Sequence, residues 1–76
     1  MQSKFKRHQR VVLLVNPDKE YIEYEPDFEE TQIKKGALGE INIILPNGKY
    51  HVRIIDKKGK AMAYVPLDEE EIGPAD

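Results

Sequence analysis

The sequence predicts a small all-β domain, and three observations favour that fold. The apolar runs are short, and the longest covers only residues 11–15. Asn47-Gly48 and Lys58-Gly59 separate three stretches in which apolar and polar residues alternate, the pattern of half-buried strands joined by tight turns. Pro26 lies in the middle of the one long irregular segment and would break a helix there.

The chain has 76 residues, a net charge of −2 and no cysteine. A domain this short buries a smaller fraction of its surface than a larger one, so hydrophobic packing or oligomerisation must hold it together without disulfides or thiolate zinc sites. No apolar run approaches the roughly 20 residues of a membrane span, and none suits a signal peptide. We expect one domain in the cytoplasm, with no membrane contact.

The elements are expected in the following order. Residues 1–9 form a flexible basic arm, and a first strand over residues 10–15 ends at the turn residues Asn16-Pro17-Asp18. Residues 17–35 form a long acidic loop, which in a compact domain is usually functional or mobile. The folded domain covers residues 10–72, and residues 73–76 form a flexible tail.

Asn47-Gly48 predicts a two-residue type I′ turn, because both central positions of that turn need a positive φ. This turn pairs Leu45 with Tyr50 and Ile41 with Ile54. It places six residues on one buried face: Ile41, Ile43, Leu45, Tyr50, Val52 and Ile54.

A second hairpin is expected around Lys58-Gly59. A two-residue turn there places Ala63, Val65 and Leu67 in the core, and Met62 and Tyr64 on the outer face. A three-residue loop with a bulge at Gly59 would exchange the two faces, and the sequence leaves both registers open. Asp68 and Glu71 have the spacing of a capping pair, which predicts a short 3-10 turn with Leu67 and Ile72 directed inward.

These elements resemble the SH3-like small β-barrels over about residues 10 to 72. The resemblance rests on twelve residues: Lys35, Gly36, Gly39, Ile41, Gly48, Tyr50, Val52, Asp56, Gly59, Ala63, Val65 and Leu67. It implies a barrel of about five short strands, which removes the exposed apolar face of an open sheet. Barrels of this shape serve unrelated functions. The chain lacks the tryptophan of the peptide-binding SH3 domains, and residues 36–44 only loosely match the motif of the KOW modules.

Catalysis is not expected. Ser3 is the only serine, Thr31 is the only threonine, and there is no cysteine, so no nucleophile has a base and an orienting group beside it. His8 and His51 lack a second ligand at a suitable spacing, and the glycines do not form a phosphate loop. We therefore expect no enzyme, no cofactor, no metal and no small-molecule substrate.

The expected function is a protein-interaction module that binds a protein partner or itself. In the favoured register, the outer face gathers apolar and polar residues into one patch: Ile44, His51, Arg53, Ile55, Met62 and Tyr64. The acidic loop adds three aromatic side chains: Tyr21, Tyr24 and Phe28. Two alternatives stay open, since the loop could fold over the patch or the bulged register could bury Met62 and Tyr64.

The alternative function is a KOW-like nucleic-acid-binding barrel. Seven basic residues could follow one edge of the barrel: Lys34, Lys35, Lys49, Arg53, Lys57, Lys58 and Lys60. Tyr64 could then stack on a base. The acidic balance of the chain opposes this function, and lysines at hairpin turns also serve to keep sheet edges from pairing with other chains.

Overall fold

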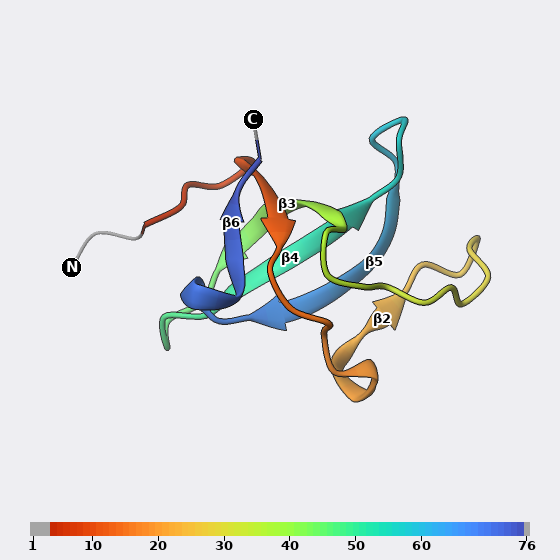
Figure 1. Cartoon of the computed structure of the whole chain (residues 1–76), viewed down its shortest axis with the longest axis horizontal. Coiled ribbons are helices and arrows are strands. Elements are labelled where there is room, and N and C mark those ends of the chain that lie inside the picture. The colour runs from red at the N-terminus through yellow and green to blue at the C-terminus, as the bar shows by residue number, and fades with distance from the viewer. Residues whose placement is uncertain (1–3, 76) are drawn as a thin grey trace.

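The computed structural model describes residues 4–75, which form one antiparallel sheet of six strands (Figure 1). The strands are β1 (Arg10–Leu13), β2 (Glu23–Tyr24), β3 (Leu38–Ile44), β4 (Tyr50–Ile55), β5 (Ala61–Leu67) and β6 (Ile72–Pro74). Two 3-10 turns accompany them, η1 (Lys19–Tyr21) and η2 (Glu69–Glu71). The strand order is β2-β5-β4-β3-β1-β6, so β2 and β6 occupy the two edges of a sheet that is not closed. The all-β prediction is confirmed.

The turn between β3 and β4 differs from the predicted one. Gly48 N–H donates to the Leu45 carbonyl (3.2 Å), Leu45 N–H donates to the Lys49 carbonyl (2.8 Å), and Gly48 has a φ of 84°. Asn47 has no positive φ, so the loop is a three-residue turn that ends in a left-handed glycine. The predicted type I′ turn is therefore wrong. Pro46 explains the difference, because proline favours the first central position of a type I turn.

A bulge at Asn42 adds a second change of register in this hairpin. The ladder pairs Ile44 with Tyr50 and Ile41 with Val52, and it shifts between Ile41 and Ile43. The bulged turn and the bulge each move the pairing by one residue, so Ile41 keeps its predicted place in the core. Ile43 does not: it pairs with His51 and is 48 % exposed, which corrects its predicted burial.

The second hairpin combines a bulged turn with the predicted register. Gly59 N–H donates to the Asp56 carbonyl (3.0 Å), and Gly59 has a φ of 83°. The ladder nevertheless pairs Arg53 with Tyr64, because a further irregularity at Met62 offsets the shift of the turn. The predicted faces are confirmed: Ala63, Val65 and Leu67 are buried, whereas Met62 and Tyr64 are half-buried on the other face.

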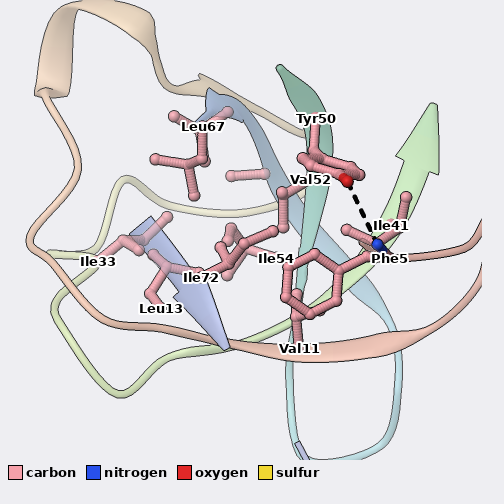
Figure 2. Close-up of a cluster of buried hydrophobic side chains, with 12 residues drawn as sticks. Phe5, Val11, Leu13, Ile33, Ile41, Tyr50, Val52, Ile54, Leu67 and Ile72 are labelled. Atoms are coloured by element: carbon pink, nitrogen blue, oxygen red, sulfur yellow. Dashed lines mark hydrogen bonds between the residues drawn. The ribbon is translucent and has the colours of Figure 1, made fainter. Parts of the chain in front are cut away.

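The N-terminal segment belongs to the fold, contrary to the predicted arm. The Phe5 side chain is only 2 % exposed, and its ring contacts Tyr50 edge-on at a centroid distance of 5.6 Å. Its backbone N–H donates to the Tyr50 hydroxyl (3.2 Å), as Figure 2 shows. His8, with a φ of 70°, donates its N–H to the Ile41 carbonyl (2.7 Å). The first three residues of the predicted arm lie outside the described residues.

The C-terminal segment also belongs to the sheet. Gly73 is buried and pairs with Val12, so β6 takes up the first two residues of the predicted tail, and the Ala75 N–H donates to the Arg10 carbonyl (3.2 Å). The last residue of the predicted tail lies outside the described part of the chain. Before it, the Asp68 N–H donates to Glu71 Oε1 (2.8 Å), which confirms the predicted capping pair and its 3-10 turn.

The core fills the concave side of the sheet (Figure 2). It forms one cluster with contributions from β1, β3, β4, β5 and β6, from the N-terminal segment and from the loop before β3: Phe5, Val11, Leu13, Ile33, Ile41, Tyr50, Val52, Ile54, Ala63, Val65, Leu67 and Ile72.

Candidate binding face on strands β1 to β5

The register of the sheet aligns five side chains in one row on the face opposite the core. Cross-strand partners lie on the same face of a sheet. Arg10 pairs with Glu40, Glu40 with Arg53, Arg53 with Tyr64, and Tyr64 with Glu23. We call these five residues, which cross β1, β3, β4, β5 and β2, the outer row.

Ion pairs and a cation–π contact connect the outer row. Arg10 Nε lies 3.6 Å from Glu40 Oε2, and Arg53 Nη1 lies 3.4 Å from Glu40 Oε1. The Arg53 guanidinium carbon lies 6.0 Å from the centroid of the Tyr64 ring. Exposed pairs of this kind contribute about 0 to 1 kcal/mol each, so their main effect is to orient the arginines.

The bulge residue Asn42 extends this network. Arg53 Nη2 donates to Asn42 Oδ1 (3.1 Å), and Arg7 Nε donates to the Asn42 backbone carbonyl (3.3 Å). Arg53 Nε is buried and has no hydrogen-bond partner among the described residues. Three arginines from the N-terminal segment, β1 and β4 therefore converge on Glu40 and Asn42.

The same network selects one tautomer of the neutral His51 ring. Because arginine only donates, Asn42 must direct its amide oxygen at Arg53 and its NH₂ at His51 Nδ1, 3.0 Å away. His51 Nδ1 is then an acceptor, and the ring carries its proton on Nε2. The ring also stacks on Tyr64, with centroids 5.4 Å apart and planes at 10°.

Four of the six predicted patch residues lie on the outer face, and each of them is only partly exposed. His51, Arg53, Met62 and Tyr64 are half-buried on the outer face. Ile55 is only 5 % exposed, since the register shift next to it turns it out of the surface, so its predicted place in the interface is corrected.

Ile43 and Ile44 in β3 also differ from expectation. Ile44 was predicted for the patch and Ile43 for the core. Ile44 is 36 % exposed but pairs with the buried Tyr50 rather than with His51. Ile43 takes the position beside His51. The sequence signal for this exchange is Pro46, which sets the turn and with it the register.

The three loop aromatics lie in different environments. Tyr21 in η1 is 59 % exposed. Tyr24 in β2 is half-buried against the core, and its hydroxyl donates to the Thr31 carbonyl. Phe28 is half-buried with Lys60 Nζ 5.2 Å from its ring centroid. The loop extends the sheet edge through β2, which pairs with β5.

The predicted basic residues lie in separate places rather than along one edge. Lys34 and Lys35 precede β3. Lys49 precedes β4, at the end opposite the turn that holds Lys57, Lys58 and Lys60. Lys49 Nζ lies 2.9 Å from Asp68 Oδ1, and this hydrogen bond raises the pKa of Lys49 above its ordinary value.

The turn between β4 and β5 contains the second perturbed group. Asp56 Oδ1 accepts hydrogen bonds from the N–H groups of Lys60 (2.9 Å) and Lys58 (2.8 Å). These two hydrogen bonds lower the pKa of Asp56 below its ordinary value, and the bond from Lys60 has the larger effect.

A cavity of about 410 Å³ lies on another part of the surface. It opens between residues 16–24 and 30–33 and is lined among others by Asn16, Lys19, Tyr24 and Glu30. Asn16 Oδ1 accepts a hydrogen bond from the backbone N–H of Lys35 (2.8 Å). This side chain therefore connects the two ends of the loop, and its oxygen is already engaged within the protein.

Within residues 4–75, no group of three or more histidine, aspartate or glutamate side chains is arranged to hold a metal ion. In the same residues, no helix has the length and apolar character needed to cross a membrane. No protein family, no curated protein and no solved structure matches this chain.

Proposed function

We propose that this chain is a non-enzymatic protein-interaction module built on an SH3-like small barrel, and that its partner binds the outer row with His51 and Ile43. The distribution of the core supports the barrel. Leu67 of β5 and Ile72 of β6 belong to one cluster although three strands separate β5 from β6 in the sheet. A sheet must curl strongly to bring such residues together.

The composition of the outer face is the observation that carries the interaction function. Arginine and tyrosine dominate the energetics of protein interfaces, most of all where apolar contacts surround them. Here Arg53 and Tyr64 lie in contact, His51 stacks beside them, and Ile43 exposes 48 % of its surface. An isolated solvated strand face does not need this combination.

The state of His51 supports a non-enzymatic function. A general base needs a free nitrogen lone pair directed at the proton it removes. Asn42 already donates to Nδ1, and Nε2 carries the proton, so the imidazole offers a donor instead of a base.

Site-specific photocrosslinking tests the interaction function. A benzophenone amino acid replaces Tyr64 on the outer face or, as the matched control, Tyr21, which is exposed in η1. We expect the Tyr64 position to give a defined protein adduct in lysate of the source cells, and excess unlabelled protein to suppress it. Excess Arg53→Gln protein should suppress it less. The proposal fails if both positions give the same adducts, or if competition does not distinguish the two proteins. Light scattering on the purified protein shows whether it self-associates, in which case the crosslinked partner is a second copy of this chain.

A nucleic-acid-binding barrel is the second candidate. The stacked rings of His51 and Tyr64 beside Arg53 favour it, because aromatic and guanidinium planes stack on bases. Salt-dependent anisotropy with labelled oligonucleotides tests it, and Lys57→Gln with Lys58→Gln should then reduce both the affinity and its salt dependence. If the protein leaves the anisotropy of the labelled oligonucleotides unchanged at low salt, this candidate is excluded.

A further inference from the structure

The arginine network on the outer face carries more positive charge than Glu40 alone neutralises. Arg7, Arg10 and Arg53 converge on Glu40 and Asn42, and Glu40 is the only acid among the residues of this network. The side chain of Arg10 is 53 % exposed and that of Arg53 is 33 % exposed, so both guanidinium groups remain within reach of a ligand.

The hydrogen-bond acceptors of the network are already occupied. Both oxygens of Glu40 face arginines, the side-chain and backbone oxygens of Asn42 accept arginine N–H groups, and His51 Nδ1 accepts from Asn42. The groups left for a ligand are the remaining N–H donors of Arg7, Arg10 and Arg53, the Nε2–H of His51 and the hydroxyl of Tyr64. A ligand that complements this face must therefore be rich in acceptors, as an anion is.

The surroundings of Tyr64 distinguish between kinds of anion. Glu23 ends the outer row beside Tyr64, and the Glu25 N–H bonds to the Met62 carbonyl, so an acidic segment borders this side of the face. Single-stranded nucleic acids place several successive phosphates along a binding surface, and this border would repel them. A peptide can instead place an acidic side chain at the arginines and apolar side chains next to Tyr64 and Ile43.

We infer that the outer face binds an acidic peptide segment of a partner protein, with a carboxylate between Arg7, Arg10 and Arg53 and an apolar side chain against Tyr64 and Ile43. This inference rests on the interaction function proposed above. It adds the chemistry of the partner: acidic residues interspersed with apolar ones.

Titration with defined peptide pools, followed by NMR of the ¹⁵N-labelled protein, tests the inference. One pool alternates glutamate or aspartate with leucine, isoleucine, tyrosine or phenylalanine, and the matched pool has glutamine or asparagine in place of the acids. We expect the acidic pool to shift the Arg53 Nε–H, the His51 ring and the amides of β3 to β5, and the amide pool to leave them unchanged. Equal shifts with the amide pool, or no shifts with millimolar acidic pool, would overturn the inference.

Variants with matched charge changes show whether the arginines act as a site. Arg7→Gln with Arg10→Gln should weaken binding of the acidic pool roughly tenfold or more, because charge-assisted hydrogen bonds are lost. Lys57→Gln with Lys58→Gln removes the same charge at the β4–β5 turn and should change the affinity by about twofold or less, because solvent screens these lysines. Equal losses in both variants mean non-specific attraction and overturn the inference. The exposed Arg7 and Arg10 make unfolding of the first variant unexpected, and the dispersion of its amide spectrum checks this.

Two further outcomes keep the inference separate from the proposed function. Oligothymidylate that shifts the same residues more strongly than the acidic pool would replace the peptide by nucleic acid. If the Tyr64 crosslink persists but the acidic pool does not bind, the partner chemistry is wrong and the interaction function stands; if both fail, both proposals fail.

Discussion

At the scale of single residues, polar side chains fix the conformation of the β4–β5 turn and the orientation of the side chains on the outer face. Asp56 holds two N–H groups of the β4–β5 turn through one oxygen, and Asn42 bridges Arg53 and His51. Neither contact follows from hydrophobic patterning, because each depends on a local backbone irregularity.

The first residue-scale prediction concerns Asp56. Its pKa is lowered in the folded protein, so its carboxylate stabilises the fold above the ordinary pKa of aspartate, and this stabilisation is lost as the pH falls through the lower folded pKa. Asp56→Ala should reduce the melting temperature at neutral pH, and the difference from the wild type should shrink in acid below about pH 4. Thermal unfolding over a pH series measures this. Asp56→Asn keeps an oxygen acceptor without the charge, and a wild-type acid dependence in this variant would contradict the assignment.

The second residue-scale prediction concerns the His51 ring. With Asn42 donating to Nδ1, the neutral imidazole should be the Nε2–H tautomer. Long-range ¹H–¹⁵N NMR at alkaline pH distinguishes a protonated from an unprotonated ring nitrogen. Asn42→Ala removes the donor and should allow a mixture of tautomers, whereas an Nδ1–H signal in the wild type would show that the amide is oriented the other way.

At the scale of elements, the turns and strands show what the sequence could predict. The alternation of apolar residues predicted the core faces of β4 and β5 correctly, because both register shifts of the second hairpin cancel. The same rule failed for Ile43, since the bulge at Asn42 lies between it and Ile41. A bulge has no fixed sequence signature, whereas the type of turn could have been predicted from Pro46.

The element-scale prediction compares two buried strand glycines. A Cβ at Gly39 would lie 2.7 Å from Val52 Cγ1 and 3.2 Å from the Arg53 carbonyl oxygen, whereas a Cβ at Gly73 would lie 3.5 Å from the Leu14 side chain. Gly39→Ala should lower the free energy of unfolding by about 1 to 3 kcal/mol through overpacking, and Gly73→Ala should have a smaller effect. Urea denaturation measures both. Equal effects would show that β3 and β4 separate more easily than their packing indicates.

At the scale of the whole molecule, one core holds the sheet, the N-terminal segment and the C-terminal strand together. The predicted arm was wrong because Phe5 is a lone aromatic residue among basic ones, where no periodicity reveals its burial. The candidate site was only partly predictable for the same reason: the sequence placed Arg53, His51 and Tyr64 on one face, but Arg7, Arg10 and Glu40 join them only through pairing across β1 and β3.

The whole-molecule prediction concerns Phe5. Phe5→Ala should cost about 3 to 5 kcal/mol of the free energy of unfolding, through lost burial and the cavity left beside Tyr50. This is a large share of the stability of a small domain, so unfolding should begin at a much lower urea concentration. Lys6→Ala, at an exposed neighbouring position, should change stability by less than about 0.5 kcal/mol. Similar denaturation curves for the wild type and Phe5→Ala would mean that this segment is not needed for the core.

The pairing of β1 with β6 has a consequence for biosynthesis. Val12 pairs with Gly73, so β1 needs as its neighbour a segment that leaves the ribosome 61 residues later (73 − 12 = 61). Contacts this distant in the chain slow folding, and until residues 72–74 emerge the outer edge of β1 stays open to strands of other nascent chains. The sheet is therefore complete only after β6 has been synthesised, and a translational pause before residue 72 would leave an incomplete sheet.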